Sequence, residues 1–171
     1  MNVPINKDVE IRTAIFSDLP IIQDLANEIW PVAYNNILSK RQLTYMLELM
    51  YSNEALEKQM FLGGTFIIAE IDNEAVGFAS FKDKENGVFK LDKLYVLPQL
   101  QNKGTGKQLL AEVIKRVLEV GGKEIQLQVN RKNNAVGFYT KMGFEIIRQE
   151  DFSIGNGFYM NDYIMSLRLK N

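Results

Sequence analysis

A change of hydrophobic period at Thr65 constrains the fold of this chain more than any other feature. Two β-rich runs between Thr65 and Lys82 flank Asp72 and Asn73, a pair of residues that favours a two-residue hairpin turn. A third β-rich run follows and ends at Pro98. Strands joined by such short turns pair antiparallel, so we expect three neighbouring antiparallel strands in this part of the chain.

The first third of the chain carries helical patterns instead. Residues 9–16 alternate loosely and predict a strand, and Ser17 is placed as the N-cap of a helix that Pro31 should stop. Ser39 is the expected cap of a second helix, and a shorter helical piece covers residues 53–60.

The last third of the chain alternates helices and strands. Residues 105–120 carry apolar pairs every four positions, which predicts a buried helical face, and a strand at 123–130 follows. Asn133 is placed to cap a short helix that ends at Gly143, and two β-rich runs finish the chain. The expected order is β-α-α-βββ-α-β-α-ββ, a single α+β domain over residues 1–171 with a mixed, mostly antiparallel sheet flanked by helices.

Composition excludes several classes of chemistry. The 171 residues, 46% of them hydrophobic, suit one domain with a sizeable core, and a net charge of −1 gives no general attraction to nucleic acid or to an anionic membrane. Without any cysteine or histidine, the chain has no disulfide, no Ser-His triad and no histidine-ligated metal, and no tight carboxylate cluster suggests another metal site. No apolar run is long enough for a signal peptide or a membrane span, so we expect a cytoplasmic protein.

A glycine turn precedes the most strongly patterned helix, and its backbone N–H groups could hold a phosphate. Gly104 and Gly106 could equally relieve strain in a tight turn. A Walker loop requires glycine where Gln101 stands and Ser or Thr where Gln108 stands, and a dinucleotide-binding fingerprint requires glycine at Leu109. Both of these phosphate-binding loops are therefore disfavoured.

Two segments together resemble a known enzyme superfamily. The string Q-N-K-G-T-G at residues 101–106 resembles the [Q/R]-x-x-G-x-[G/A] coenzyme A loop of the GCN5-related N-acetyltransferase (GNAT) superfamily. Residues 133–144, N-N-A-V-G-F-Y-T-K-M-G-F, resemble its N-x-A-x-x-x-Y-x-K-x-G-F segment, again placed after a strand. The resemblance extends over residues 9–169 and implies acetyl-CoA as the acetyl donor.

The resemblance implies where the donor binds. The pyrophosphate should lie on the loop that comprises Gln101, Asn102, Lys103, Gly104, Thr105, Gly106 and Lys107. The pantetheine arm should pair with the backbone of Leu94, Tyr95 and Val96 and contact Asn133. Asn133 could also act only as a helix cap, and the two lysines could be ordinary surface residues.

The resemblance also implies catalytic roles, and direct transfer from the thioester to an amine suits a chain without the usual nucleophiles. Tyr139 matches the family's general acid, which protonates the departing coenzyme A sulfur, although it could also be a core tyrosine. Asp92 is the candidate general base, since a two-residue period places it in phase with Leu94 and Val96. It could instead pair with a neighbouring lysine such as Lys90 or Lys93.

The acceptor is less well specified. By family analogy Glu28, Trp30 and Tyr34 should line its site, as a carboxylate and two aromatic faces that suit a cationic amine. The C-terminal segment and residues 53–60 resemble a bacterial subgroup that acetylates spermidine and spermine, so polyamines are the leading candidates. The alternatives are another small amine, an aminoacyl compound, a protein N-terminus or lysine, or an acetyl-CoA sensor without catalysis. Relatives suggest a possible homodimer.

Overall fold

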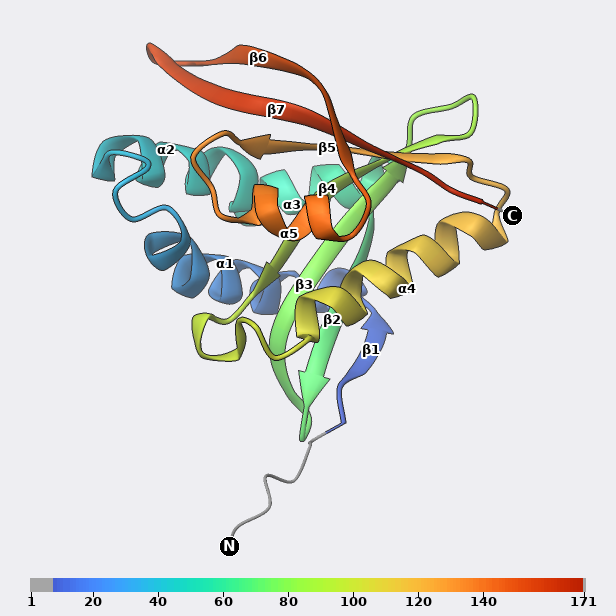
Figure 1. Cartoon of the computed structure of the whole chain (residues 1–171). Helices are drawn as coiled ribbons and strands as arrows, with labels where there is room; N and C mark the ends of the chain where they lie inside the picture. Colours follow the sequence, from blue (N-terminus) through green and yellow to red (C-terminus); the bar gives the residue numbers. More distant parts are fainter. Residues whose placement is uncertain (1–7, 171) are drawn as a thin grey trace, which may run out of the picture.

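One seven-stranded sheet organises the computed structural model, which describes residues 8–170 (Figure 1). The sheet order is β1-β2-β3-β4-β5-β7-β6, and every neighbouring pair is antiparallel except the parallel pair β4 and β5. The strands are β1 (Glu10–Thr13), β2 (Thr65–Ile71), β3 (Glu74–Asp83), β4 (Val88–Val96), β5 (Glu124–Asn130), β6 (Glu145–Gly155) and β7 (Phe158–Arg168). The helices are α1 (Leu19–Ala33), α2 (Lys40–Tyr51), α3 (Asn53–Phe61), α4 (Thr105–Glu119) and α5 (Ala135–Lys141), with short 3₁₀ turns η1 (Phe16–Asp18) and η2 (Pro98–Leu100). The predicted α+β class and the antiparallel run of β2, β3 and β4 are confirmed.

The predicted hairpin turn joins β2 to β3. Asp72 and Asn73 have φ angles of 51° and 65°, so both lie in the left-handed region that a type I′ turn requires. This predicted turn is confirmed, and it makes β2 and β3 antiparallel neighbours in the sheet that carries the site.

The first helix begins and ends differently from the sequence prediction. Ser17 is not its N-cap, because residues 16–18 form a 3₁₀ turn and Asp18 precedes the first helical residue. The Asp18 carboxylate accepts a 2.8 Å hydrogen bond from the backbone N–H of Ile15 and is paired with Arg12 of β1. Contacts of Asp18 with the preceding strand and loop therefore accompany the later start of the helix.

Pro31 does not stop α1, which continues to Ala33. The rings of Trp30 and Tyr34, four residues apart on the final turn, lie 4.6 Å from each other, and the Tyr34 hydroxyl makes a tertiary contact of 2.9 Å with the Tyr95 hydroxyl. These contacts offset the missing N–H of the proline and carry Tyr34 over the middle of the sheet.

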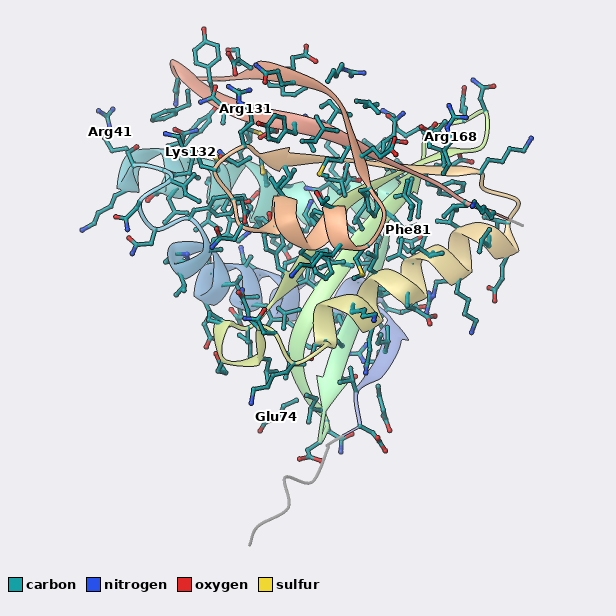
Figure 2. The ribbon with its side chains drawn as sticks, viewed as in Figure 1. Arg41, Glu74, Phe81, Arg131, Lys132 and Arg168 are labelled. Carbon is teal, nitrogen blue, oxygen red and sulfur yellow. The ribbon has the colours of Figure 1, made fainter. Side chains whose placement is uncertain are left out.

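Helices cover both faces of the sheet (Figures 1 and 2). The helix α4 packs on the face turned toward the viewer, with Leu109, Val113 and Val117 fully buried, and its end is followed by Gly121 with a φ of 81°. The helix α1 packs against β3 and β4 on the opposite face and buries Ile22 and Ile29. The central strands β3 and β4 therefore have helices on both faces.

Over residues 8–170 no helix has the length and apolar character needed to cross a membrane. In the same range, no three His, Cys, Asp or Glu side chains gather closely enough to hold a metal ion.

Candidate active site

The glycine loop presents several free backbone N–H groups at the start of α4. Within residues 8–170, the N–H groups of Gly104, Thr105, Gly106 and Lys107 have no hydrogen-bond acceptor. Gly104 has a φ of 89°, a left-handed conformation that favours glycine, and it directly precedes the helix. Free N–H groups and the positive end of the helix dipole together make an anion-binding site.

The surface of this loop is open to solvent. The side chains of Gln101, Asn102, Lys103 and Lys107 are all exposed, whereas Thr105 is buried beneath them. The exposed lysines add local positive charge beside the free N–H groups, in a chain whose net charge is only −1.

A slot opens where β4 and β5 diverge. Their parallel pairing covers only residues 88–91 and 124–127, after which β5 continues with β7 alone. The β5-facing edge of residues 92–96 therefore has no strand partner. Residues 91–95 and 127–129 line the slot, so an extended ligand arm could pair with the free edge of β4.

Tyr139 and Asn133 reach this slot from the segment after β5. Tyr139 is 7% exposed and packs against the rings of Phe138 and Phe144, yet it also lines the slot. Its hydroxyl has no hydrogen-bond partner within residues 8–170, and burial raises the pKa of this phenol well above its ordinary value. Asn133 lines the slot too, while its Oδ1 accepts a 2.9 Å hydrogen bond from the N–H of Ala135 at the start of α5.

A β-bulge interrupts β4 beside the slot. Ser80 of β3 lies opposite Lys93 and Phe81 lies opposite Leu91, so Asp92 is the extra residue of the bulge. A bulge of this kind reverses the alternation of the strand from that point onward.

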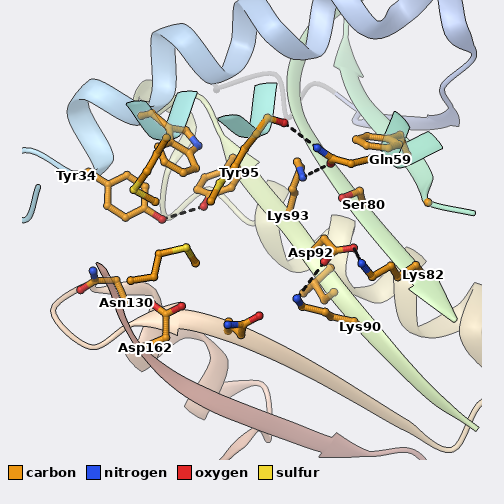
Figure 3. A pocket seen from close by; sticks show the side chains of 18 of the residues that line it. Tyr34, Gln59, Ser80, Lys82, Lys90, Asp92, Lys93, Tyr95, Asn130 and Asp162 are labelled. Carbon is orange, nitrogen blue, oxygen red and sulfur yellow. Dashed lines mark hydrogen bonds and ion pairs between the residues drawn. The ribbon is translucent and has the colours of Figure 1, made fainter. Parts of the chain in front are cut away.

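The bulge overturns the expected phase of Asp92. Leu94 and Val96 face α4, because a Cβ added at Gly106 would lie 3.8 and 3.9 Å from their side chains. Asp92 points away from α4 into a larger cavity, on the same side as Lys93 (Figure 3). The two-residue period that placed Asp92 with Leu94 and Val96 is therefore wrong.

This larger cavity has a volume of about 300 Å³ and adjoins the slot, with which it shares Tyr34, Tyr95 and residues 91–93 of β4. One wall is aromatic, since the ring of Trp30 lies 4.6 Å from that of Tyr34 and 5.7 Å from that of Tyr95. The sequence placed Trp30 and Tyr34 in one site, and the structure brings both to this wall. Glu28 is exposed on α1 and does not line either cavity, so the structure does not bring it to the site.

Lysines of β3 and β4 form a second wall. Asp92 lies 3.8 Å from Nζ of Lys82 and 3.5 Å from Nζ of Lys90. Lys93 is 9% exposed and donates a 2.5 Å hydrogen bond to Oε1 of Gln59. Burial lowers the pKa of Lys93 to about 8, and the neighbouring lysines act in the same direction while Asp92 opposes them.

A buried carboxylate on β7 completes the cavity. Asp162 is 3% exposed, and its Oδ2 has no hydrogen-bond partner within residues 8–170. Burial raises its pKa to about 6, against the opposing effect of Arg131. The sequence reasoning missed this residue, although an acidic side chain in phase with Met160 and Ile164 on an inward-facing strand was the available signal.

Comparisons with known proteins identify the family of this chain. Residues 36–167 match the family model described as an acetyltransferase (GNAT) domain. The chain is 32% identical to a spermidine N(1)-acetyltransferase of Thermoplasma acidophilum over 144 residues, 81% of this chain and 89% of that protein. It is 30% identical to a Bacillus subtilis spermine/spermidine N(1)-acetyltransferase over 48% of this chain and 60% of that protein.

Solved structures show the same fold. The crystal structure of the PaiA N-acetyltransferase of T. acidophilum, in complex with coenzyme A, superposes with a TM-score of 0.80 at 30% identity, covering 95% of this chain and 99% of that one. A GCN5-related N-acetyltransferase of Rhodopseudomonas palustris superposes with a TM-score of 0.81 at 21% identity, over 94% of this chain and 95% of that one. By these matches in sequence and fold, the chain belongs to the GNAT family of acetyl-CoA-dependent N-acetyltransferases.

Proposed function

We propose that this protein transfers an acetyl group from acetyl-CoA directly to a primary amine of a small molecule. One observation carries the proposal: the slot between β4 and β5, which contains Tyr139, opens onto a separate cavity of about 300 Å³. A donor arm and an acceptor can therefore approach each other from two sides. A cavity of that volume suits a small molecule.

The donor would bind mainly through backbone groups. The pyrophosphate would accept hydrogen bonds from the free N–H groups at residues 104–107, and the exposed Lys103 and Lys107 would attract it. The pantetheine arm would extend along the unpaired edge of β4 at residues 92–96, beside Asn133. A backbone N–H of this edge would polarise the thioester oxygen.

Two proton transfers accompany the reaction. The amine attacks the thioester carbon, the C–S bond breaks, and Tyr139 would give its phenolic proton to the departing thiolate. Its raised pKa keeps the phenol protonated at neutral pH, so the proton is available when the thiolate forms.

The amine must lose a proton before it attacks, because an alkyl ammonium has a pKa near ~10.4. Asp92 remains the predicted base, although its two lysine contacts engage the carboxylate. Asp162 is a second candidate, since it is buried, has a free oxygen and has a pKa raised to about 6.

Polyamines are the first acceptors to assay, because curated relatives act on spermidine and spermine. A purified sample mixed with acetyl-CoA and a panel of amines should release coenzyme A thiol in an amine-dependent way. Binding of coenzyme A without thiol release on any amine would favour a sensor. Release only with peptides would favour a protein N-terminus or lysine as acceptor. A shift of the unfolding temperature on adding coenzyme A checks donor binding separately.

A further inference from the structure

The polar groups of the larger cavity differ between its two sides (Figure 3). We call the lysine wall the set formed by Ser80, Lys82, Lys90 and Lys93 on β3 and β4. Asp162 lies away from this wall, on β7 beside Asn130 (Figure 3). The cavity therefore offers positive groups on one side and a carboxylate on another.

Positive charge exceeds negative charge at the lysine wall. The single carboxylate of Asp92 is shared by Lys82 and Lys90, at 3.8 and 3.5 Å. Lys93 has a neutral partner, the side-chain amide of Gln59, and its ammonium also lies 5.2 Å from the ring centre of Tyr51. Neither contact supplies a negative charge, so the wall can accept an anion.

A buried hydroxyl adds a hydrogen-bond donor to the same wall. Ser80 is 2% exposed, and its Oγ has no hydrogen-bond partner within residues 8–170. A buried hydroxyl without a partner is costly, and an oxygen of a bound acid would satisfy it. The hydroxyl and the excess of lysine charge thus favour the same kind of ligand group.

Asp162, in contrast to the lysine wall, favours a cationic ligand group. Its free Oδ2 is buried and can accept hydrogen bonds, so an ammonium group would satisfy both its charge and its lone pairs. It also lies near Tyr34, whose hydroxyl it influences electrostatically and which borders the slot that contains Tyr139. An amine held here would be close to the entrance of the slot.

The cavity is poorly matched to a polyamine. Three lysines and two aspartates line it, so a ligand carrying several ammonium groups would add positive charge beside an existing excess. A ligand with one amine and one acid would neutralise both sides. Resting on the acetyl transfer proposed above, we propose that the acceptor is a primary amine that also carries an acidic group, with the amine at Asp162 and the acid at the lysine wall.

The sharpest test uses amines that differ only at their far end. The probes are 4-aminobutanoate, 1-aminobutane and 1,4-diaminobutane, which carry an acid, a methyl group and a second amine on the same carbon chain. Spermidine, an α-amino acid and 3-aminopropylphosphonate complete the panel. Comparing 3-aminopropylphosphonate with 4-aminobutanoate shows whether the enzyme prefers a phosphate-like acid or a carboxylate. We expect kcat/KM for at least one acid-bearing amine to exceed that of the neutral and doubly basic amines by at least about tenfold.

Variants locate the source of that preference. Lys90→Gln should lower the preference for the acid-bearing amine over 1-aminobutane by about tenfold, mainly through KM, because one of the wall's charges is lost. Lys84→Gln is the matched control, since Lys84 is exposed on the β3–β4 turn and does not line the cavity; its preference should not change. Lys90→Glu should shift the preference toward 1,4-diaminobutane.

Each outcome has a defined meaning. If spermidine or 1,4-diaminobutane is acetylated at least as well as every acid-bearing amine, the inference is overturned while the proposed acetyl transfer stands. An acid preference that Lys90→Gln leaves unchanged also overturns the inference, because the acid is then bound elsewhere. If coenzyme A raises the unfolding temperature but no amine releases thiol, the proposed transfer itself fails.

Discussion

The proposed donor side and the proposed acceptor side of the active site are built from different parts of the chain. The donor side uses backbone groups of one nearly continuous stretch, from the β4 edge at residues 92–96 to the start of α4. The proposed acceptor cavity uses side chains from α1, α2, α3, β2, β3, β4, β5 and β7. A site built from contiguous backbone leaves a readable motif in the sequence, whereas one built from distant side chains leaves only scattered residues.

The strongest test of the donor side is Tyr139→Phe. Removing the phenolic proton donor should lower kcat by about 10²–10⁴-fold while the affinity for acetyl-CoA changes little, because only the leaving group loses its proton. Steady-state kinetics and calorimetric titration measure the two quantities. Tyr159→Phe, at an exposed tyrosine of β7, is the matched control and should keep full turnover. Unchanged turnover in Tyr139→Phe would make that residue structural.

Gly104→Glu should weaken coenzyme A binding by at least about 100-fold. An added Cβ would meet no atom within 4 Å, so the effect comes from the φ of 89° and from a negative charge at the anion site. Gly104→Asn separates the two causes, since asparagine tolerates the left-handed conformation and carries no charge. Normal affinity in the Glu variant would contradict the placement of the pyrophosphate.

Asp162→Asn should make the folded protein more stable at neutral pH while lowering acetylation. The pKa of Asp162 rises from 3.8 to about 6 on folding, so ionising this carboxyl lowers the free energy of unfolding. The loss is small below about pH 4, grows as the pH rises to about 6, and is constant above that pH. At ~1.36 kcal/mol per pKa unit the gain for the variant is at most about 3 kcal/mol above pH 6. Urea unfolding at pH 4 and pH 7 measures it; an equal gain at both pH values would contradict the assignment.

Glu28→Gln should have the smallest effect, a change in kcat/KM within about twofold, because Glu28 is exposed and outside both cavities.

Tyr34→Phe is the variant to compare with Glu28→Gln, because Tyr34 lines the cavity. It removes the 2.9 Å hydroxyl contact to Tyr95 at the cavity wall and should raise the acceptor KM by about fivefold. A large change in kcat/KM for Glu28→Gln would show that the acceptor binds outside the cavity described above.

Local patterns predicted most of the fold. The turn at Asp72 and Asn73 and the helix that follows Gly104 depend on interactions between near neighbours in sequence, so their signals are local. Ser17 and Pro31 failed as markers of the ends of α1 because Asp18 pairs with Arg12 of the neighbouring strand β1 and Tyr34 contacts Tyr95 of β4. Tertiary contacts of this kind outweigh the local preference.

The sequence by itself determined the order of strands and helices. It also determined the glycine loop with its free N–H groups. Both depend on hydrogen bonds and backbone preferences that act over a few residues. The tertiary structure alone decided which groups surround the proposed acceptor cavity. The bulge at Asp92 put Lys93 on the same side of β4 as that carboxylate and turned Leu94 and Val96 to the other side, and the pairing of β7 with β5 brought Asp162 to the same cavity. Charge and burial act through space, so groups far apart along the chain acquire a shared function only once the sheet has formed.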